Sequence, residues 1–395
     1  MAKPLVLYYI HTYFLDSCLE TLQSIKYHVD IDLIIEVSRD SLKSTVFELD
    51  DISSYRRLED VKDVFSPDVW NQFSTYFEHL RSVRVLFFKG RSMFGFDNMM
   101  GGLLLGRLIH ANRYSVIHFD TASARAIMSL FFMFKKRLVM TIHDPVVHTG
   151  ESSFVLNFVR NVYKRFSNAL FFYSAYSLDV FTQSNHTATP NVSMLMLQPY
   201  SFIAQFKGNK LPFRNHILFF GQLSYYKGID LLLQAIPIVL KQYPDEHFII
   251  AGKSSGYKMD NKLITQYPNN IHFIHEYLCI EELSNLINNA KFVVCPYREA
   301  TQSGVLMTAF AMGRSVLATN VGAFPEYINN GVNGLLSDTD YYSIAQGILE
   351  MLESDHYMML EKQVSTAHST NASEHNKNTL LEVYSLPQSS TVMAC

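Results

Sequence analysis

The stretch Lys291–Leu336 reads KFVVCPYREATQSGVLMTAFAMGRSVLATNVGAFPEYINNGVNGLL. It predicts a buried strand, a tight polar loop, a helix, a second strand, a glycine turn, another helix and a short strand. The loop Ala300–Gly304 follows the apolar run Phe292–Val294 and precedes a helix expected over Val305–Met312. Free backbone N–H groups and the positive end of the helix dipole attract anions at such a helix start. The loop is therefore expected to bind a phosphate-bearing ligand at the carboxyl end of a strand.

Short apolar runs alternate with helical stretches along the whole chain. Their apolar residues are consecutive, as in strands that are buried on both faces of a parallel sheet. Strands are predicted at Leu5–Ile10, Ile31–Val37, Val83–Phe88, Ser115–Phe119, Leu138–Ile142, Ala169–Tyr173, Ser193–Leu197, Ile217–Gly221, Phe248–Ala251, Ile271–Ile274, Phe292–Pro296, Val316–Thr319 and Leu335–Ser337. Helices between them, such as Leu231–Tyr243 and Glu281–Asn289, complete repeated βαβ units. The pattern predicts an α/β protein with doubly wound parallel sheets.

The length of 395 residues exceeds what one hydrophobic core usually serves, so two domains are expected. Strand signals stop near Gln198–Asn215, where proline, glycine and basic residues collect. The predicted division is an N-terminal domain over residues 1–198, a C-terminal domain over residues 199–365, and a closing helix with a tail over residues 366–395. Within that last segment, Glu374–Tyr384 carries the helical pattern.

Composition limits the partners and the setting. The formal net charge of −3 gives no global attraction to nucleic acid, so any basic surface must be local. The four cysteines are scattered and form no C-x-x-C pair, which argues for a reducing compartment and against zinc or disulfides. The first apolar run is too short to span a membrane and has no cleavage site after it, so it predicts a strand. A cytoplasmic location is expected.

Two stretches are candidates for contact with a lipid surface. Phe154–Phe166 combines Arg160, Lys164 and Arg165 with apolar residues. Such a helix can lie on the inner face of an anionic membrane, although packing against a sheet with a charged outer edge is the commoner arrangement. The run Met93–Ile109 is unusually apolar and fits either a groove for a lipid acceptor or ordinary core. Peripheral membrane contact and plain packing both stay open.

Several pieces of the second half occur in the order and spacing of a known family. The strand and loop that follow Pro296 lead to Val316–Thr319, then to Gly322–Glu326 and to Asn333–Leu336. This order resembles the donor-binding region of retaining GT-B glycosyltransferases of the glycosyltransferase 4 type. The ATQSGV loop resembles that of a subset of bacterial polysaccharide enzymes. The resemblance implies a GT-B fold, in which two Rossmann-like domains face a central cleft.

The same resemblance implies an activity. A hexosyltransferase-type enzyme would move a sugar from a nucleotide-diphosphate donor to a glycan or lipid-linked acceptor, with retention of configuration. The nucleotide sugar is a substrate, so no bound cofactor is expected. No metal is expected either, because no Asp-x-Asp lies in a suitable place. A role in cell-surface polysaccharide biosynthesis follows from the subset with the ATQSGV loop.

The loop Gly221–Gly228 resembles the first loop of the family's C-terminal domain. It follows a predicted strand and precedes a helix that begins near Ile229. The family holds the donor diphosphate here with an arginine and a lysine. Gln222 stands at the arginine position, so Lys227 alone carries over as the cation that binds and stabilises the leaving diphosphate. A solvated lysine beside a helix start is the alternative for Lys227. Gly221 and Gln222 complete the donor-binding loop.

The second donor loop lacks the family's paired glutamates. When Gly313 is matched to the glycine that closes the helix, the two glutamate positions hold Ala300 and Thr308. How the ribose is bound therefore stays open, with Thr308 kept as a donor-side residue. Glu326 matches the glutamate of the family's glycine turn and is expected either to contact the donor or to stabilise the turn. We expect hydroxyl and N–H groups to bind the donor phosphates, and these groups come from Thr301, Gln302, Ser303 and Gly304. The alternative is that they simply cap the helix.

The remaining candidates are polar residues near strand ends. His143 ends a predicted strand and matches a family histidine that contacts the donor sugar near the reacting centre. Together with Lys227 it is the predicted catalytic pair, although a structural strand-end histidine is the alternative. The weaker candidates, expected on the acceptor side, are His11, His148 and Glu151. For His11 a structural role is the favoured interpretation. His118 and Asp120 also follow a predicted strand.

Two other functions share this architecture. A nucleotide-sugar epimerase has the same two-domain shape, but would need paired carboxylates at the cleft, which the sequence does not place. A non-catalytic GT-B partner subunit is compatible with Gln222, with Thr308 and with a first loop, Ile10–Phe14, that lacks the family's glycines. A Rossmann dehydrogenase is disfavoured, because no G-x-G-x-x-G follows the first strand.

Overall fold

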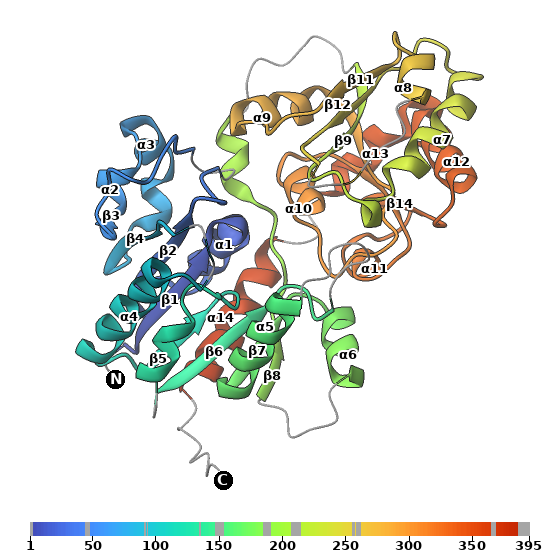
Figure 1. Cartoon of the computed structure of the whole chain (residues 1–395). Coiled ribbons are helices and arrows are strands. Elements are labelled where there is room, and N and C mark those ends of the chain that lie inside the picture. Colours follow the sequence, from blue (N-terminus) through green and yellow to red (C-terminus); the bar gives the residue numbers. More distant parts are fainter. Residues whose placement is uncertain are drawn as a thin grey trace.

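The computed structural model describes residues 3–43, 48–90, 92, 94–133, 136–146, 154–184, 191–206, 215–254, 257, 262–364 and 369–385. These residues form two α/β lobes, each built on a largely parallel sheet (Figure 1). The N-terminal lobe is blue to green in that view, with the red helix α14 against it, and the C-terminal lobe is yellow to orange-red. The predicted fold class, with two doubly wound parallel sheets, is confirmed.

The N-terminal sheet has eight strands in the order β3-β4-β2-β1-β5-β6-β7-β8. All neighbours pair in parallel except β3, which runs antiparallel to β4 at the edge. The strands are β1 (Leu5–His11), β2 (Asp30–Ser38), β3 (Leu58–Asp60), β4 (Ser82–Phe88), β5 (Val116–Phe119), β6 (Arg137–Ile142), β7 (Ala169–Phe172) and β8 (Asn191–Met194). The sequence pattern missed only β3, whose three residues are not buried and form no apolar run.

The C-terminal sheet has six parallel strands in the order β11-β10-β9-β12-β13-β14. They are β9 (His216–Phe220), β10 (Phe248–Ala251), β11 (Ile271–Ile274), β12 (Ala290–Cys295), β13 (Val316–Thr319) and β14 (Gly334–Ser337). The strand order reverses between β9 and β12, as it does at β1 in the first sheet. Ligands of open α/β sheets bind at such switch points, outside the carboxyl ends of the strands.

Helices cover the sheets. In the N-terminal lobe and the linker they are η1 (Thr12–Phe14), α1 (Leu15–Ile25), α2 (Val61–Val64), α3 (Pro67–Phe77), α4 (Phe96–Ala111), η2 (Ile127–Phe132), α5 (Phe154–Phe166), α6 (Ala175–Ser184) and η3 (Ser201–Phe206). Those after the linker are η4 (Tyr225–Lys227), α7 (Ile229–Leu240), α8 (Lys262–Gln266), α9 (Ile280–Asn289), α10 (Gly304–Ala311), α11 (Phe324–Tyr327), α12 (Tyr341–Leu352), η5 (Glu353–Asp355), α13 (His356–Val364) and α14 (Ser369–Ser385). None of the helices in these described ranges combines the length and the apolar character needed to cross a bilayer.

Both faces of the N-terminal sheet are buried. Along β1, Val6, Tyr8 and Ile10 belong to one core with residues of α1 and α3, whereas Leu7 and Tyr9 belong to a second core with residues of α4 and α5. Successive side chains of a strand point to opposite faces. A strand that is covered on both sides therefore carries an apolar residue at nearly every position.

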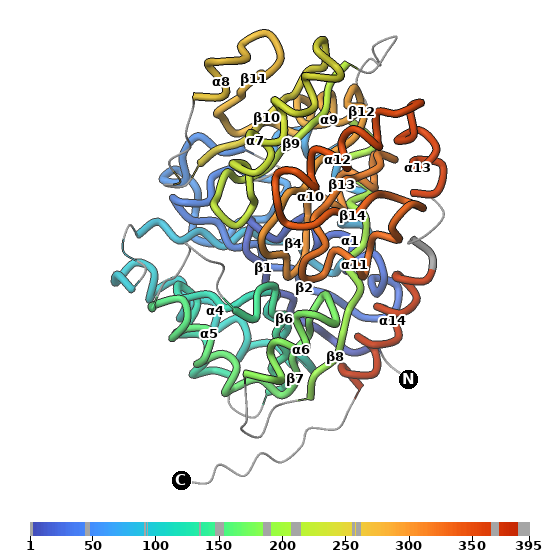
Figure 2. The backbone as a smooth tube through the Cα atoms, turned by 90° about the vertical axis from the view of Figure 1, so that its right-hand side faces the viewer, coloured from blue at the N-terminus to red at the C-terminus, as the bar shows by residue number. Residues whose placement is uncertain are grey.

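The last helix, α14, lies against the N-terminal lobe beside α1 and β8 (Figures 1 and 2). Asn376 is fully buried and pairs with the Met196 backbone, accepting from its N–H at 2.7 Å and donating to its carbonyl at 2.8 Å. The Tyr384 hydroxyl lies 2.6 Å from Nδ1 of His118 on β5. Burial lowers the pKa of His118 to about 4, so this imidazole is neutral near pH 7. The chain thus crosses from the second lobe back to the first.

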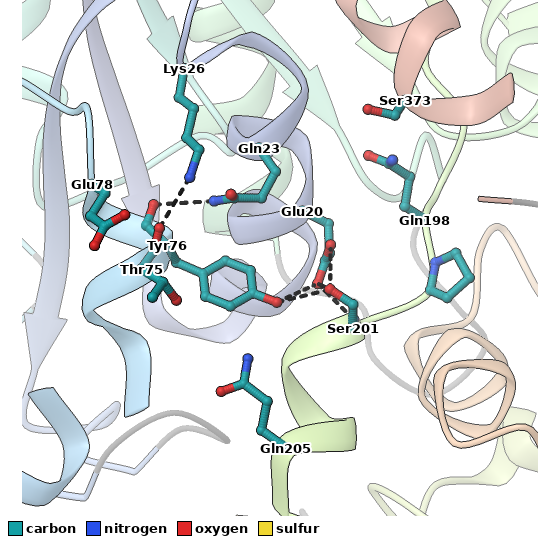
Figure 3. A pocket seen from close by; sticks show the side chains of 11 residues that line it. Glu20, Gln23, Lys26, Thr75, Tyr76, Glu78, Gln198, Ser201, Gln205 and Ser373 are labelled. Atoms are coloured by element: carbon teal, nitrogen blue, oxygen red, sulfur yellow. Dashed lines mark hydrogen bonds between the residues drawn. The ribbon is translucent and has the colours of Figure 1, made fainter. Parts of the chain in front are cut away.

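The linker between the lobes is hydrogen-bonded to α1. Residues of both segments line a polar pocket with a volume of about 490 Å³ (Figure 3). The Glu20 carboxylate of α1 accepts hydrogen bonds from the Ser201 N–H at 2.7 Å and from the Ser201 hydroxyl at 2.9 Å. The Tyr76 hydroxyl of α3 lies 2.8 Å from Oγ of Ser201. Burial raises the pKa of Glu20 to about 7. A titratable group therefore holds the start of η3.

A Glu20→Gln variant tests this titration. Burial raises the pKa of folded Glu20 to about 7 from its ordinary value of 4.5, so the folded chain binds the proton more tightly than the unfolded chain does. Protonation of Glu20 therefore contributes to the free energy of unfolding. This contribution is complete below about pH 4.5 and is lost as the pH rises through about 7. We expect the variant to lack this loss, so that its free energy of unfolding relative to wild type rises across the window by up to about 3 kcal/mol.

Urea unfolding at a series of pH values across this window measures the effect. Gln205→Ala is the control, because it alters the same pocket without removing a titratable group, and it should keep the wild-type pH dependence. Parallel pH profiles for wild type and Glu20→Gln would contradict the prediction.

Candidate functional site

The loop between β9 and α7 places a lysine at the switch point of the C-terminal sheet. Gly228 has φ of +64°, and a Cβ there would lie 1.9 Å from the Pro296 carbonyl oxygen, so the loop packs directly on the chain that leaves β12. Gly221 also has a positive φ, of +112°. The Lys227 side chain is mostly buried between these two loops, with its ammonium 5.2 Å from the ring centre of Tyr297. The two sequence-predicted donor loops are thus neighbours.

The loop between β12 and α10 carries the predicted phosphate site. The Ser303 hydroxyl accepts from the Leu306 N–H at 3.2 Å and caps α10, which begins at Gly304. The expected helix cap is therefore confirmed, and the first turn of α10 with its remaining backbone N–H groups follows the carboxyl end of β12. One turn later, the Thr308 hydroxyl donates to the Gly304 carbonyl at 2.8 Å. Contact of Thr308 with a ribose stays a prediction.

The two lobes meet at His143, just after β6. Nε2 of Gln302 lies 2.9 Å from Nδ1 of His143, and the Thr301 hydroxyl hydrogen-bonds to the Asp144 carboxylate. An amide nitrogen only donates, so Nδ1 accepts and the imidazole proton lies on Nε2. Oε1 of Gln302 is buried and, among the described residues, has no hydrogen-bond partner. The structure thus brings together a predicted catalytic residue and the predicted donor loop from opposite lobes.

Asp120 is the residue that supports His143. Its Oδ2 lies 2.9 Å from Nε2 of His143, and its Oδ1 accepts from the Tyr8 hydroxyl at 3.1 Å. The imidazole also stacks on Phe14, with 3.7 Å between ring centres. Burial, and then the Asp120 charge, raise the pKa of Tyr8 well above its ordinary value. The sequence offered only one signal for Asp120, its place after β5, because the pairing of β5 with β6 is a tertiary fact.

The acceptor-side candidates have separate outcomes. His148 and Glu151 lie outside the described residues. Nδ1 of His11 accepts from the Tyr13 N–H at 3.3 Å, and its Nε2 lies 3.8 Å from the Glu36 carboxylate. Burial lowers the pKa of His11. These contacts begin η1 and are structural, and a role in acceptor binding stays a prediction.

Glu326 bridges the lobes. Its two carboxylate oxygens accept from the Ala175 N–H at 2.8 Å and from the Tyr176 N–H at 2.7 Å, so a side chain of the second lobe caps α6 of the first. The preceding turn rests on the donor loop: Gly322 has φ of +54°, and a Cβ there would lie 1.9 Å from the Ala300 carbonyl oxygen. A donor contact of Glu326 stays a prediction, since the contacts in this structure are those of a helix cap.

Two serines next to this cap reach the donor loop itself. The hydroxyls of Ser174 and Ser177 donate to the Thr301 carbonyl at 2.8 Å and 3.0 Å. The start of α6 is therefore joined both to the glycine turn and to the loop before α10. Separation of the two lobes would break all of these hydrogen bonds together.

Removal of the Glu326 carboxylate should loosen this junction. We expect Glu326→Ala to lower the free energy of unfolding by about 1–2 kcal/mol, because two helix N–H groups lose their acceptor. Glu326→Gln keeps one acceptor and should lose less. We also expect a larger radius of gyration for Glu326→Ala, since the lobes lose a contact.

Urea unfolding and small-angle X-ray scattering measure the two effects. Glu382→Ala, at an exposed position of α14, is the control. Equal losses in Glu326→Ala and in the control would show that the cap contributes nothing to the junction.

Comparison with known proteins places this site in context. Residues 214–354 match the family model of Glycosyl transferases group 1. An uncharacterized glycosyltransferase of Methanocaldococcus jannaschii is 28% identical over 143 residues, which cover 36% of this chain and 39% of that protein. D-inositol 3-phosphate glycosyltransferase of Corynebacterium urealyticum is 27% identical over 180 residues, which cover 43% of this chain and 42% of that protein. The chain thus spans about two fifths of the length of these relatives, and residues 214–354 are similar to group 1 glycosyltransferases.

A solved structure extends the likeness to the whole fold. The Anabaena protein Alr3699/HepE in complex with UDP and glucose superposes with a TM-score of 0.66 at 15% identity, over 97% of this chain and 100% of that chain. The chain has the GT-B fold. The expected GT-B architecture is therefore confirmed, and the resemblance in the second half agrees with the family match.

The site shows no ready place for a metal within the part of the chain that the structure describes, where no group of three or more His, Cys, Asp or Glu side chains is arranged to hold one. Independence from a metal and from a bound cofactor stays a prediction.

Proposed function

We propose that the chain is a glycosyltransferase of the hexosyltransferase type. It moves a sugar from a nucleotide-diphosphate donor to a hydroxyl group of a glycan or lipid-linked acceptor, with retention of configuration and without a metal ion. The observation that carries the proposal is the 2.9 Å contact between Gln302 of the donor loop and His143 of the opposite lobe. The match of residues 214–354 and the HepE structure in complex with UDP-glucose support it. We further propose a cytoplasmic role in cell-surface polysaccharide biosynthesis, with peripheral contact to the membrane.

In this proposal the C-terminal lobe binds the diphosphate. The Lys227 ammonium and the N–H groups at the start of α10 lie at the same switch point, where they would offset the negative charge of the phosphates. That charge grows as the bond between the anomeric carbon and the phosphate oxygen breaks. Groups that are already fixed in place stabilise it without reorganising.

The N-terminal lobe would hold the sugar. Asp120 fixes the proton of His143 on Nε2 and leaves Nδ1 as an acceptor. A sugar hydroxyl that displaces the Gln302 amide can donate to Nδ1, or it can donate to Oε1 of Gln302, which has no hydrogen-bond partner among the described residues. The acceptor oxygen then bonds to the anomeric carbon, and its proton passes to the leaving diphosphate. The contacts between the lobes keep water from this centre.

A panel of nucleotide-diphosphate sugars tests the proposal. The cognate donor should raise the melting temperature in a thermal-shift measurement, because it binds the folded chain alone. Incubation of that donor with candidate acceptors should then release the nucleoside diphosphate and give a glycosylated product. Formation of an epimer without any acceptor would instead indicate an epimerase. A chain that binds no nucleotide sugar in the panel would be a non-catalytic partner.

A Lys227→Ala variant tests the phosphate site. We expect a weaker affinity for the donor and slower transfer, with a combined loss in kcat/KM of about 10²–10³-fold, since a buried cation no longer faces the leaving group. Steady-state kinetics with varied donor separate the effect on KM from the effect on kcat. Lys241→Ala, at the exposed end of α7, is the control. Unchanged donor affinity and turnover in Lys227→Ala would remove Lys227 from the mechanism.

A further inference from the structure

The N-terminal lobe carries a large apolar surface that the fold does not cover. On α5, Phe154 is 87% exposed and Phe158 is 56% exposed. Phe158 follows Phe154 by four residues, so these two rings share one side of the helix, and Phe166 at the last position of α5 is 49% exposed. The sheet-facing side of α5 is a different one, formed by the fully buried Val159 and Tyr163. The exposed aromatic residues therefore do not serve the core.

A second helix on the same face of the sheet also exposes large apolar side chains. Helices α4 and α5 contribute to the same core on one face of the N-terminal sheet (Figure 1). At the start of α4, Phe96 is 79% exposed, and Met99 and Met100 are each more than one third exposed. We call these residues together the α4–α5 surface: Phe96, Met99, Met100, Phe154, Phe158 and Phe166. Isolated apolar residues are normal on protein surfaces, but a group of large ones marks an interaction site.

The α4–α5 surface lies at the edge of the sheet that carries the candidate site. Strands β4 and β6 run parallel, and α4 and α5 follow them in the chain, so both helices begin near the carboxyl ends of the strands. Arg160 of α5 donates to the Asp144 carbonyl at 2.5 Å, directly after His143. Whatever covers this surface is therefore held beside the N-terminal side of the cleft.

The charges on the two helices are mainly basic. Helix α5 contains Arg160, Lys164 and Arg165 and no acidic residue. Helix α4 contains the exposed Arg107, and its single acidic residue, Asp97, is ion-paired with Arg57. The chain as a whole has a net charge of −3, so this basic character is local. Large apolar residues beside cations are the combination that binds anionic lipid surfaces.

We propose that the α4–α5 surface docks the chain onto an anionic lipid bilayer, with the cleft held at the membrane surface. A second copy of the chain fits less well, because a two-fold contact would bring the same cations of both copies together. The inference rests on the proposed function only for its consequence, that a lipid-linked acceptor reaches the cleft from the bilayer. The binding itself is measured without any sugar transfer.

Co-sedimentation of the full chain with vesicles tests the proposal. Vesicles of phosphatidylcholine with about one third phosphatidylglycerol should bind the chain at least about tenfold more strongly than phosphatidylcholine alone, and added salt should weaken this binding. A Phe154→Ser/Phe158→Ser variant should lose at least about tenfold in partition, because it removes the most exposed aromatic side chains of α5. An Arg107→Glu/Arg165→Glu variant should lose the preference for anionic vesicles.

The matched control is Tyr341→Ser/Tyr342→Ser on α12 of the other lobe, whose rings are 44% and 59% exposed. It should bind vesicles as the wild type does. All variants change exposed side chains, and circular dichroism with thermal melting verifies that they fold. Thermal shift with the cognate nucleotide sugar should be unchanged in the Phe154→Ser/Phe158→Ser variant, which separates failure of docking from failure of the proposed function.

Three results would overturn the proposal. One is a wild-type chain that does not bind anionic vesicles. Another is an equal loss in the control and in the Phe154→Ser/Phe158→Ser variant. The third is self-association of the chain in solution that this variant abolishes, which would assign the surface to a second copy.

Discussion

The hydrogen bond between Gln302 and His143 joins the lobes at the point where both sheets present their carboxyl ends. His143 is 4% exposed, and its imidazole is fixed on the other side by Asp120. Buried polar groups need partners, so the orientation of His143 depends on residues from two lobes at once. A ligand that enters the cleft must replace this contact with one of its own. The geometry of the candidate site is therefore a property of the closed pair of lobes.

The glycine-rich turns allow this closeness. A side chain at Gly228 or at Gly322 would meet a carbonyl oxygen at 1.9 Å, so the loops after β9 and β13 pack on the β12 loop only because these residues have no Cβ. The β12 loop is in turn held from the first lobe by Ser174 and Ser177. The donor loop is thus enclosed on several sides, which suits a site that must exclude water. The residues of the α4–α5 surface make none of these contacts with the donor loop.

The order of secondary structure followed from local patterns. Strands buried on both faces have consecutive apolar residues, and every such strand was found within three residues of its predicted ends. Strand β3 escaped because it is a short edge strand with no buried residue. The helical pattern in Glu374–Tyr384 marked only part of α14, which begins at Ser369, since its polar first turns carry no apolar periodicity.

The candidate site was less accessible from the sequence. Motif order pointed to Lys227, His143 and the loop before α10, but it gave no partner for any of them. The donor loop is 159 residues from the histidine that it contacts, and Glu326 is 151 residues from the helix N–H group that it caps. Asp120 is 23 residues from His143 and reaches it only because β5 pairs with β6.

The sequence by itself determined which segments are strands and helices and where a helix cap and a glycine turn must occur, and it predicted which loops bind phosphate. Those features depend on interactions between residues close together in the sequence, or on the burial of one or both faces of a strand or helix. The tertiary structure alone decided which strands became neighbours, how the lobes dock, and that Glu326 caps a helix of the other lobe. Such contacts depend on the packing of the entire chain, and the pattern around any one residue does not contain them.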